Sequence, residues 1–210
     1  MNDSPISRHL SPIIRHLSPT IHVYICDRLN EFDLGAALLL LPEQRREQAL
    51  SFKFEAGRRQ SVAAYLLLCE GLSREYGFTK PPVFEYGEHG KPFIKTPPGY
   101  ESSLPFFNLS HCREAAICVL SDRPVGVDIE SIREFRESLA RYTMNESELH
   151  QILQSDTPAE AFIRLWTMKE ATLKRSGEGI RNNMKDVLSG QHALEAFVNK
   201  TRGYVYTVAY

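Results

Sequence analysis

Two short segments of the sequence combine carboxylates with a lysine at spacings that would suit phosphoryl chemistry. In the segment GVDIE, which has the pattern of a short strand, Asp128 and Glu130 are two residues apart and should point from the same face. In the segment WTMKEATLK, which has the pattern of a helix, Glu170 and Lys174 are four residues apart and should be neighbours. Three carboxylates beside an ammonium group suit a magnesium ion that holds a phosphate, with the lysine close enough to reach the same anion.

Each of these pairs has a simpler explanation when it is taken alone. Asp128 and Glu130 could be solvated side chains on an edge strand, since most acidic residues lie on protein surfaces. Glu170 and Lys174 could be an ordinary helix-surface pair, which contributes about 0.2–0.5 kcal/mol. It is the joint occurrence of both pairs with the segment NLSH, at residues 108–111, that favours a site.

The composition narrows the class of protein. The chain has 210 residues and a formal net charge of −1, so it is long enough for one domain of ordinary size or two small ones. No long basic run indicates a nucleic-acid groove, and any phosphate recognition should therefore be local. Four cysteines without a CxxC pair are typical of reduced thiols in a cytoplasmic protein, and no apolar stretch reaches the length of a membrane span.

The N-terminus contains a short repeat, in which RHLSP at residues 8–12 recurs at residues 15–19. This unit is much shorter than a structural repeat, and the segment lacks the continuous apolar core of a signal peptide. We therefore expect residues 1–19 to form a poorly ordered leader, and the sequence leaves open whether that leader is native.

The rest of the sequence predicts helices and strands in an order typical of an α+β protein. Each of two halves, residues 20–107 and residues 108–210, reads as strand, helix and further strands, and the second carries the predicted metal site. This order fits two similar α+β halves better than a doubly wound parallel sheet. The predicted strands are 21–26, 83–86, 92–94, 106–111, 115–120, 125–130 and 203–210, and the predicted helical regions are 42–76, 146–153 and 158–175.

Four motifs follow one another along the chain: GKP at residues 90–92, NLSH at 108–111, GVDIE at 126–130 and WTMKEA at 166–171. With these motifs the chain resembles the 4′-phosphopantetheinyl transferases, specifically the longer type whose two halves form a pseudo-dimer. The resemblance runs from about Pro42 to Lys174. One such motif alone would be a weak signal, whereas four in matching order and spacing are specific.

The resemblance implies an enzyme that moves the phosphopantetheine arm of coenzyme A onto a serine of an apo acyl, peptidyl or aryl carrier domain and releases 3′,5′-ADP. Carried over by position, Asp128, Glu130 and Glu170 are the expected Mg²⁺ ligands, and Glu170 also counts among the catalytic residues. Lys174 resembles the family lysine that contacts the transferred phosphate and assists the departing ADP. Glu146 lies where many members place the carboxylate that takes the serine proton, with Glu148 or a water molecule as alternatives.

The resemblance also implies ligands for coenzyme A. Ser110 and His111 match the residues that bind the nucleotide phosphates. Arg58 matches an arginine that family members use on the nucleotide, and guanidinium geometry suits phosphate. Lys91 should add a second positive charge, and Gly90 should let the backbone approach the ligand closely.

Two positions depart from the family pattern. Cys112 stands where a serine often follows the histidine, and Gln44 stands where some relatives have a phosphate-binding lysine. Arg45 or Arg46 could replace that lysine, so the residue that holds the 3′-phosphate stays open. We interpret the neighbouring Arg59 as part of a solvated helix face.

Two other functions remain compatible with these motifs. The chain could be a homologue that binds coenzyme A or a carrier without transferring anything, or a Mg²⁺-dependent phosphohydrolase that uses water in place of serine. Two halves in one chain favour a monomer, with coenzyme A and an apo carrier protein as partners and neither nucleic acid nor membrane involved. The sequence does not identify the carrier, the pathway or the tolerance for acyl-CoA.

Overall fold

The computed structural model describes residues 4–87, 90–96, 104–177 and 184–210, which form an α+β protein. The described helices are α1 (Pro5–Leu10), α2 (Leu34–Leu39), α3 (Glu43–Leu50), α4 (Glu55–Tyr76), α5 (Glu137–Thr143), α6 (Glu146–Leu153) and α7 (Pro158–Ser176). The described strands are β1 (Ile13–Ser18), β2 (Ile21–Cys26), β3 (Phe84–Tyr86), β4 (Pro92–Ile94), β5 (Phe106–His111), β6 (Ala116–Ser121), β7 (Gly126–Ser131), β8 (Leu194–Asn199) and β9 (Tyr204–Ala209).

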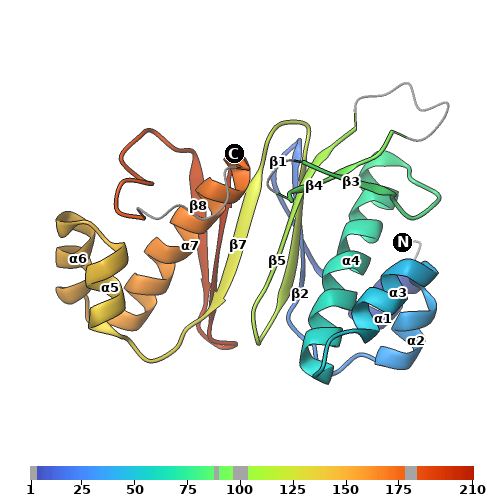
Figure 1. Cartoon of the computed structure of the whole chain (residues 1–210), viewed down its shortest axis with the longest axis horizontal. Coiled ribbons are helices and arrows are strands. Elements are labelled where there is room, and N and C mark those ends of the chain that lie inside the picture. The colour runs from blue at the N-terminus through green and yellow to red at the C-terminus, as the bar shows by residue number, and fades with distance from the viewer. Residues whose placement is uncertain (1–3, 88–89, 97–103, 178–183) are drawn as a thin grey trace.

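The larger strands form two antiparallel sheets, and three strands of the first sheet have the same order as the three strands of the second. The first sheet has the order β1-β2-β6-β5 and the second has the order β7-β9-β8. In each sheet the strand that comes last in the chain lies between two earlier ones, and a long helix packs on the sheet, α4 on the first and α7 on the second. Figure 1 shows β5 and β7 side by side between these two helices, which agrees with the close approach of the two strands.

Most of the local elements agree with the sequence-based expectation, and the α+β class is confirmed. The helical region predicted over residues 42–76 is divided, because the chain leaves helical geometry between Leu50 and Glu55. Its predicted end is correct: Gly77 adopts the left-handed conformation, with φ at 68°, that glycine allows at a helix C-terminus.

The boundary between the predicted halves does not match the boundary between the sheets. Residues 107 and 108 both lie within β5, and β5 pairs with β6, which pairs with β2 of the first sheet. The chain changes sheet between Ser121 and Gly126. Strand pairing over this distance is a tertiary property that the local pattern of residues 106–121 does not reveal.

The expectation of a poorly ordered leader is wrong for residues 4–19. The segment forms α1 and β1, and β1 extends the first sheet by pairing antiparallel with β2. Leu10 is only 2 % exposed and belongs to the apolar cluster under α4. A helix of six residues and a strand of six are too short to show a clear periodicity in the sequence.

The first segment is also held by a buried carboxylate. Glu70 of α4 has no exposed surface and accepts hydrogen bonds from the hydroxyls of Ser4 and Ser7 and from the guanidinium of Arg74. Burial alone would raise the pKa of Glu70, but the hydrogen bonds from these three side chains outweigh it, so the pKa is lowered. The charged form of Glu70 therefore connects α1 to α4.

We expect Glu70→Gln to lower the free energy of unfolding by about 1.5–3 kcal/mol, because a neutral amide replaces the charged acceptor of these hydrogen bonds. Since the folded-state pKa of Glu70 lies below its ordinary value of 4.5, its contribution is present above that pH and is lost as the pH falls further. Melting temperatures of the two proteins should thus differ near pH 7 and converge as the pH falls below 4.5. A constant difference would contradict this, and Glu47→Gln on an exposed face serves as the control.

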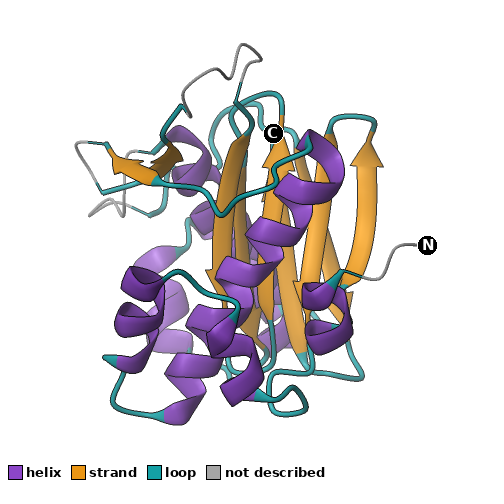
Figure 2. Cartoon of the chain, turned by 90° about the vertical axis from the view of Figure 1, so that its right-hand side faces the viewer, coloured by secondary structure: helices purple, strands orange, loops and turns teal. Residues whose placement is uncertain are grey.

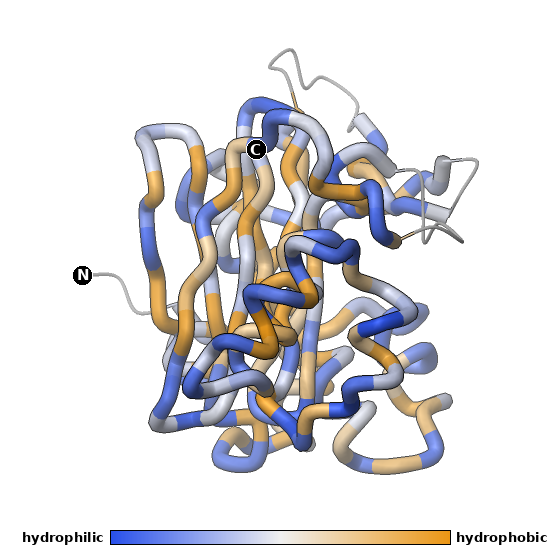
Figure 3. Tube along the Cα trace, turned by 90° about the vertical axis from the view of Figure 1, so that its left-hand side faces the viewer, coloured by the Kyte–Doolittle hydropathy of each residue, from blue (hydrophilic) through white to orange (hydrophobic). Residues whose placement is uncertain are grey.

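The core lies between each sheet and its helices and between the two sheets. Figure 2 shows α4 and the shorter helices in front of the first sheet, and Figure 3 shows hydrophobic segments along the strands and alternating hydropathy along the helices. One apolar cluster fills the space between α4 and the first sheet, a second lies between the two sheets, and a third lies under α7. None of the described helices combines the length and the apolar character that a membrane crossing needs.

Candidate active site

The site is built where β7 meets α7, and a glycine allows the two to approach. A Cβ atom at Gly126 would overlap the backbone of Ala171 and Arg175, so a larger residue there would push the strand away from the helix. Asp128 follows two residues later on β7, beside the last turns of α7. The glycine of GVDIE therefore sets the distance between Asp128 and the side chains of α7.

Asp128 is the centre of a hydrogen-bond network from three elements. It is 4 % exposed, and its Oδ1 accepts hydrogen bonds from the ammonium of Lys174 at 2.6 Å and from the hydroxyl of Ser110 at 3.0 Å. The ammonium of Lys174 also lies 3.1 Å from the Ser110 hydroxyl oxygen. Residues from β5, β7 and α7 thus meet at one carboxylate oxygen.

The segment NLSH joins the two sheets through its side chains. The backbone N–H of Val127 donates to Oδ1 of Asn108 at 3.0 Å, and the backbone N–H of Ile129 donates to the Ser110 hydroxyl at 3.3 Å. Asn108 and Ser110 alternate along β5, so both face β7. In the structure the hydroxyl of Ser110, predicted as a nucleotide ligand, holds β7 and Asp128 in place.

Two further carboxylates interact electrostatically with Asp128. Burial in the first place, and then the negative charge of Asp128, raise the pKa of both Glu130 and Glu170. Lys174 opposes this increase in both cases. The site is therefore crowded with negative charge that Lys174, and Arg133 at Glu130, only partly balance.

Two carboxylate oxygens of this site have no hydrogen-bond partner among the described residues. They are Oδ2 of Asp128 and Oε1 of Glu170, and both are buried. Unpaired buried oxygens are costly and require an explanation. Oxygen donors alone, with excess negative charge, form the ligand type that a hard divalent cation such as Mg²⁺ prefers.

The three carboxylates share a region of the structure without converging on one point. Glu130 forms an ion pair with Arg133 at 3.0 Å. Among the described residues, the group of three potential metal ligands whose atoms all lie within 4.8 Å of one another is a different one, between the first sheet and α4. Binding of a cation by all three would therefore require their side chains to move closer together.

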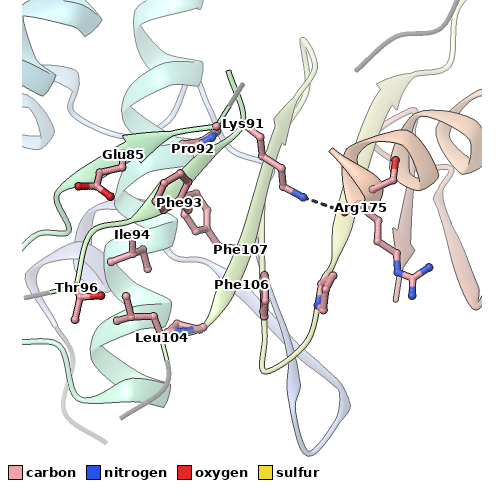
Figure 4. A pocket seen from close by; sticks show the side chains of 14 residues that line it. Glu85, Lys91, Pro92, Phe93, Ile94, Thr96, Leu104, Phe106, Phe107 and Arg175 are labelled. Atoms are coloured by element: carbon pink, nitrogen blue, oxygen red, sulfur yellow. Dashed lines mark hydrogen bonds between the residues drawn. The ribbon is translucent and has the colours of Figure 1, made fainter. Parts of the chain in front are cut away.

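A groove of about 820 Å³ lies beside this cluster, between the β3–β4 hairpin and the C-terminal end of α7 (Figure 4). Its lining is mainly apolar, with Phe93, Phe106 and Phe107 on one side and Arg175 on the other. Arg175 directly follows Lys174, whose side chain binds Asp128. The groove and the carboxylates are thus connected through the last turn of α7.

Lys91 holds the hairpin against α7. Its ammonium donates to the carbonyl oxygens of Lys174 at 2.5 Å and Arg175 at 3.1 Å, where the carbonyls of the helix end carry partial negative charge. Burial lowers the pKa of Lys91. Gly90 has a φ of 76°, so the turn before the lysine requires a glycine. In the structure the motif GKP thus closes one wall of the groove.

Two other predicted ligands lie at positions with different surroundings. His111 follows Ser110 on β5 and is exposed; partial desolvation, and then the charge of Lys174, lower its pKa. The imidazole is thus neutral near pH 7.

Arg58 lies on the first turns of α4 and donates from Nε to the carbonyl of Phe52 at 2.9 Å. Within the described part of the chain, Arg58 makes no hydrogen bond or ion pair with the three carboxylates.

Arg59 and Arg45, two other arginines near Arg58 in the sequence, both contact other parts of the fold. Arg59 donates to the backbone carbonyls of Leu29 at 3.1 Å and Phe32 at 2.7 Å, so the interpretation of this residue as a solvated helix side chain is wrong. Arg45 lies over the ring of Tyr65, 4.6 Å from its centroid. The guanidinium of Arg45 is therefore already partly engaged by the fold.

The two candidate bases differ clearly. Glu146 is the first residue of α6 and is exposed. Glu148 is buried, forms a capping box with Asn145 and makes an ion pair with Lys169 at 2.8 Å. Of the two carboxylates, the one that the fold leaves exposed is therefore that of Glu146.

Lys169 is a residue that the sequence analysis missed. It is fully buried and also donates to the carbonyl of Met184 at 2.8 Å, so it connects α7, α6 and the segment before β8. Its spacing was a usable signal, because Leu165, Lys169 and Leu173 follow one another at four-residue intervals and hence lie on one face. A lysine on an apolar helix face indicates a buried ion pair.

The chain resembles known proteins over most of its length. Residues 124–205 match the family model of the 4′-phosphopantetheinyl transferase superfamily. This match includes β7, α7 and the carboxylates described above.

Three relatives illustrate the similarity. The 4′-phosphopantetheinyl transferase AcpT of Salmonella typhimurium (strain LT2) is 38 % identical over 152 residues, which cover 69 % of this chain and 72 % of the relative. HetI of Nostoc, a 4′-phosphopantetheinyl transferase, is 35 % identical over 154 residues, covering 70 % of this chain and 63 % of the relative. Sfp of Bacillus subtilis (strain 168), another such transferase, is 26 % identical over 161 residues, covering 75 % and 70 % respectively.

Proposed function

We propose a specific reaction for this chain, which belongs to the 4′-phosphopantetheinyl transferase superfamily and is an enzyme of that kind. The reaction is the Mg²⁺-dependent transfer of 4′-phosphopantetheine from coenzyme A to a serine of an apo carrier protein. It releases 3′,5′-ADP. One structural observation carries the proposal. Two buried carboxylate oxygens, on Asp128 and Glu170, have no partner among the described residues and lie in a site that Lys174 only partly neutralises. A ligand that brings both a cation and a phosphate would satisfy this site.

We infer further that the two halves of the chain act as a pseudo-dimer with the site between them. The shared order of the strands in the two sheets supports this, as does the contact of β5 with β7. Each half then contributes to the site: Ser110, His111 and Lys91 precede the change of sheet, and the carboxylates follow it. A single chain would supply both halves, which is the reason to propose a monomer.

The residues of the site fit Mg²⁺. Asp128, Glu130 and Glu170 would hold the ion, since they offer oxygen ligands, net negative charge and two unpartnered oxygens. When bound, Mg²⁺ would neutralise the pyrophosphate of coenzyme A and polarise the phosphorus under attack.

The remaining residues would bind and orient coenzyme A. The ammonium of Lys174 is aligned by Asp128 and Ser110 and carries the positive charge nearest to Asp128, so it would contact the transferred phosphate. The neutral imidazole of His111 would donate one N–H to a phosphate oxygen. The apolar groove next to Arg175 has room for a further part of coenzyme A.

The transfer itself is a displacement at phosphorus. The oxygen of the carrier serine forms a bond to the β-phosphorus of coenzyme A, and the bond from that phosphorus to the oxygen of the departing 3′,5′-ADP breaks. The serine proton passes to the carboxylate of Glu146. Charge on the transferred group is offset by Lys174, so catalysis depends mainly on positioning and electrostatics.

We expect Glu146→Gln to lower kcat about 100-fold with little change in the KM for coenzyme A, because general base catalysis is lost while binding is retained. The control is Glu137→Gln, which removes an exposed acid from α5, the preceding helix. Measured at several pH values, the loss should be largest where the wild type is most active. Equal rates for Glu146→Gln and the wild type would assign the base to another group.

The proposed reaction is tested by the intact mass of apo carrier proteins after incubation with the protein, coenzyme A and Mg²⁺. A gain of one phosphopantetheine on the carrier, abolished by EDTA, is expected for at least one of an acyl, a peptidyl and an aryl carrier. Release of 3′,5′-ADP is measured in parallel with and without the carrier. Release that is independent of the carrier would show hydrolysis, and absence of any mass gain despite coenzyme A binding would show a homologue without transferase activity.

A further inference from the structure

A second set of titratable side chains lies where the first sheet meets the end of α4. The ring nitrogens of His16 and His22 and a carboxylate oxygen of Glu75 all lie within 4.8 Å of one another. Nδ1 of His16 is 2.7 Å from Nδ1 of His22, which is 3.5 Å from Oε2 of Glu75. None of these three residues takes part in the transfer proposed above.

The three side chains converge because of the N-terminal strand. His16 of β1 and His22 of β2 are direct partners across the antiparallel pair, and Glu75 lies in the last turn of α4. His16 comes from the second copy of the RHLSP repeat. A segment that the pattern alone assigned to a leader therefore completes a site made of three elements.

Glu75 is oriented by a buried tyrosine. The hydroxyl of Tyr24, a residue with no exposed surface, donates to Oε1 of Glu75 at 2.6 Å. This bond occupies one carboxylate oxygen and leaves Oε2 on the side of His22. Hydrogen bonds of this kind to the far oxygen of a ligating carboxylate are common around metal ions.

The donor spacing matches a tetrahedral metal ion. Zinc binds histidine nitrogen and carboxylate oxygen at about 2.0–2.2 Å, so two of its ligand atoms lie about 3.3–3.5 Å apart. The 3.5 Å between His22 and Glu75 agrees with this spacing, whereas the 2.7 Å between the two imidazoles is a hydrogen bond, so the His16 ring would have to move away from His22 to bind the same ion. His16 is exposed, so its ring has room to move and water can reach a fourth position.

The electrostatics agree with a divalent cation. His22 lies 9 % exposed between the other two side chains, so a bound ion would be partly shielded from solvent. Glu75 contributes one negative charge, and Asp122, on the turn after β6, adds a second one at longer range. Two imidazoles and one carboxylate are ligands of the type that zinc prefers over magnesium.

We propose that His16, His22 and Glu75 bind a divalent transition metal ion of the zinc type, which fastens β1 to the end of α4. The ion would connect an edge strand, its neighbour and a helix across 59 positions of sequence, from residue 16 to residue 75. Its role would be to stabilise the N-terminal segment, and the phosphate chemistry at Asp128 would not need it.

The test is a zinc titration of the full chain, stripped of metal and supplied with excess Mg²⁺ so that the carboxylate site does not compete for zinc. We expect the wild type to bind one equivalent of zinc at this site and its melting temperature to rise by about 5–10 °C at a hundredfold excess over Kd. His16→Gln and Glu75→Gln should each weaken zinc binding about 100-fold or more. Each conservative variant should remain folded without zinc, because His16 is exposed and a glutamine at position 75 can still accept the Tyr24 hydrogen bond.

The matched control is His9→Gln, which changes the histidine of the first RHLSP copy and should leave zinc binding unchanged. Imidazole ring-nitrogen signals in NMR should shift at Nδ1 of His16 and His22 when zinc is added. Absence of zinc binding to the wild type would overturn the proposal. So would zinc binding that persists in both His16→Gln and Glu75→Gln but is lost in Glu170→Gln, since the metal would then occupy the carboxylate site.

Discussion

Replacing Glu170 by glutamine should lower kcat/KM for phosphopantetheine transfer by about 10³-fold or more, while leaving the protein at least as stable as the wild type. The loss of activity is expected because the substitution removes one of three anionic oxygen ligands from the proposed Mg²⁺ site. The gain or neutrality in stability has a separate cause. Glu170 is 8 % exposed, one of its oxygens has no partner among the described residues, and Asp128 repels its charge.

The direction of the stability effect follows from the pKa of Glu170. Burial and then the charge of Asp128 raise this pKa in the folded protein, so the folded state holds the proton up to a higher pH than the unfolded state does. The carboxyl therefore costs stability increasingly as the pH rises through the raised pKa. A glutamine carries no charge at any pH, and the difference in melting temperature between the two proteins should grow from acidic pH towards neutrality.

The transfer assay and thermal unfolding, both without and with Mg²⁺, check these expectations. Added Mg²⁺ should stabilise the wild type and have a much smaller effect on Glu170→Gln. Glu160→Gln, on the first turn of the same helix, is the control and should markedly change neither the transfer rate nor the melting temperature. If both Glu170→Gln and Asp128→Asn transferred at the wild-type rate, the assignment of the metal site would be wrong.

The largest loss of stability is expected from Lys169→Met. Lys169 has no exposed surface, and its ammonium lies 2.8 Å from Oε2 of Glu148. Removing one partner of a buried ion pair leaves the other charge without compensation, which costs about 3–5 kcal/mol. For a chain of this length that corresponds to a decrease of about 6–20 °C in melting temperature.

A double-mutant cycle separates this cause from a simple packing defect. Glu148→Gln keeps the capping box, because a glutamine can accept from the backbone N–H of Asn145 as the glutamate does. The double variant Lys169→Met/Glu148→Gln contains no uncompensated buried charge and should recover part of the stability. Additive losses would instead indicate that packing around the lysine stem dominates. Arg141→Met, which breaks the exposed pair with Glu137, should cost less than about 1 kcal/mol.

The sequence determined those features that depend on neighbours in the chain. Asp128 and Glu130 alternate along a strand, and the glutamate and lysine of WTMKEATLK are one helical turn apart, so their relative placement follows from local geometry. For the same reason the hairpin around Gly90 and the end of α4 at Gly77 were predicted correctly. The order of the motifs was enough to indicate the family.

The tertiary structure decided which of these side chains are available. Ser110 and Lys91 were expected to face a ligand. In the structure the hydroxyl of Ser110 accepts a hydrogen bond from the backbone of β7, and the ammonium of Lys91 donates to two carbonyls of α7. Glu146 and Glu148 are indistinguishable by type and spacing, and only the burial of Glu148 against Lys169 separates them. These outcomes depend on packing between elements that are far apart in the chain.

The N-terminal segment shows most clearly that a local sequence pattern does not reveal contacts with distant residues. In isolation residues 4–19 are too short and too polar to predict a helix and a strand, and their order comes from contacts with partners such as Glu70, His22 and the core around Leu10. A local sequence pattern indicates which secondary structure a segment would adopt if it packed against an apolar surface. Whether such a surface exists is decided by the rest of the chain, because burial and hydrogen bonding to distant residues supply the free energy that orders a short segment.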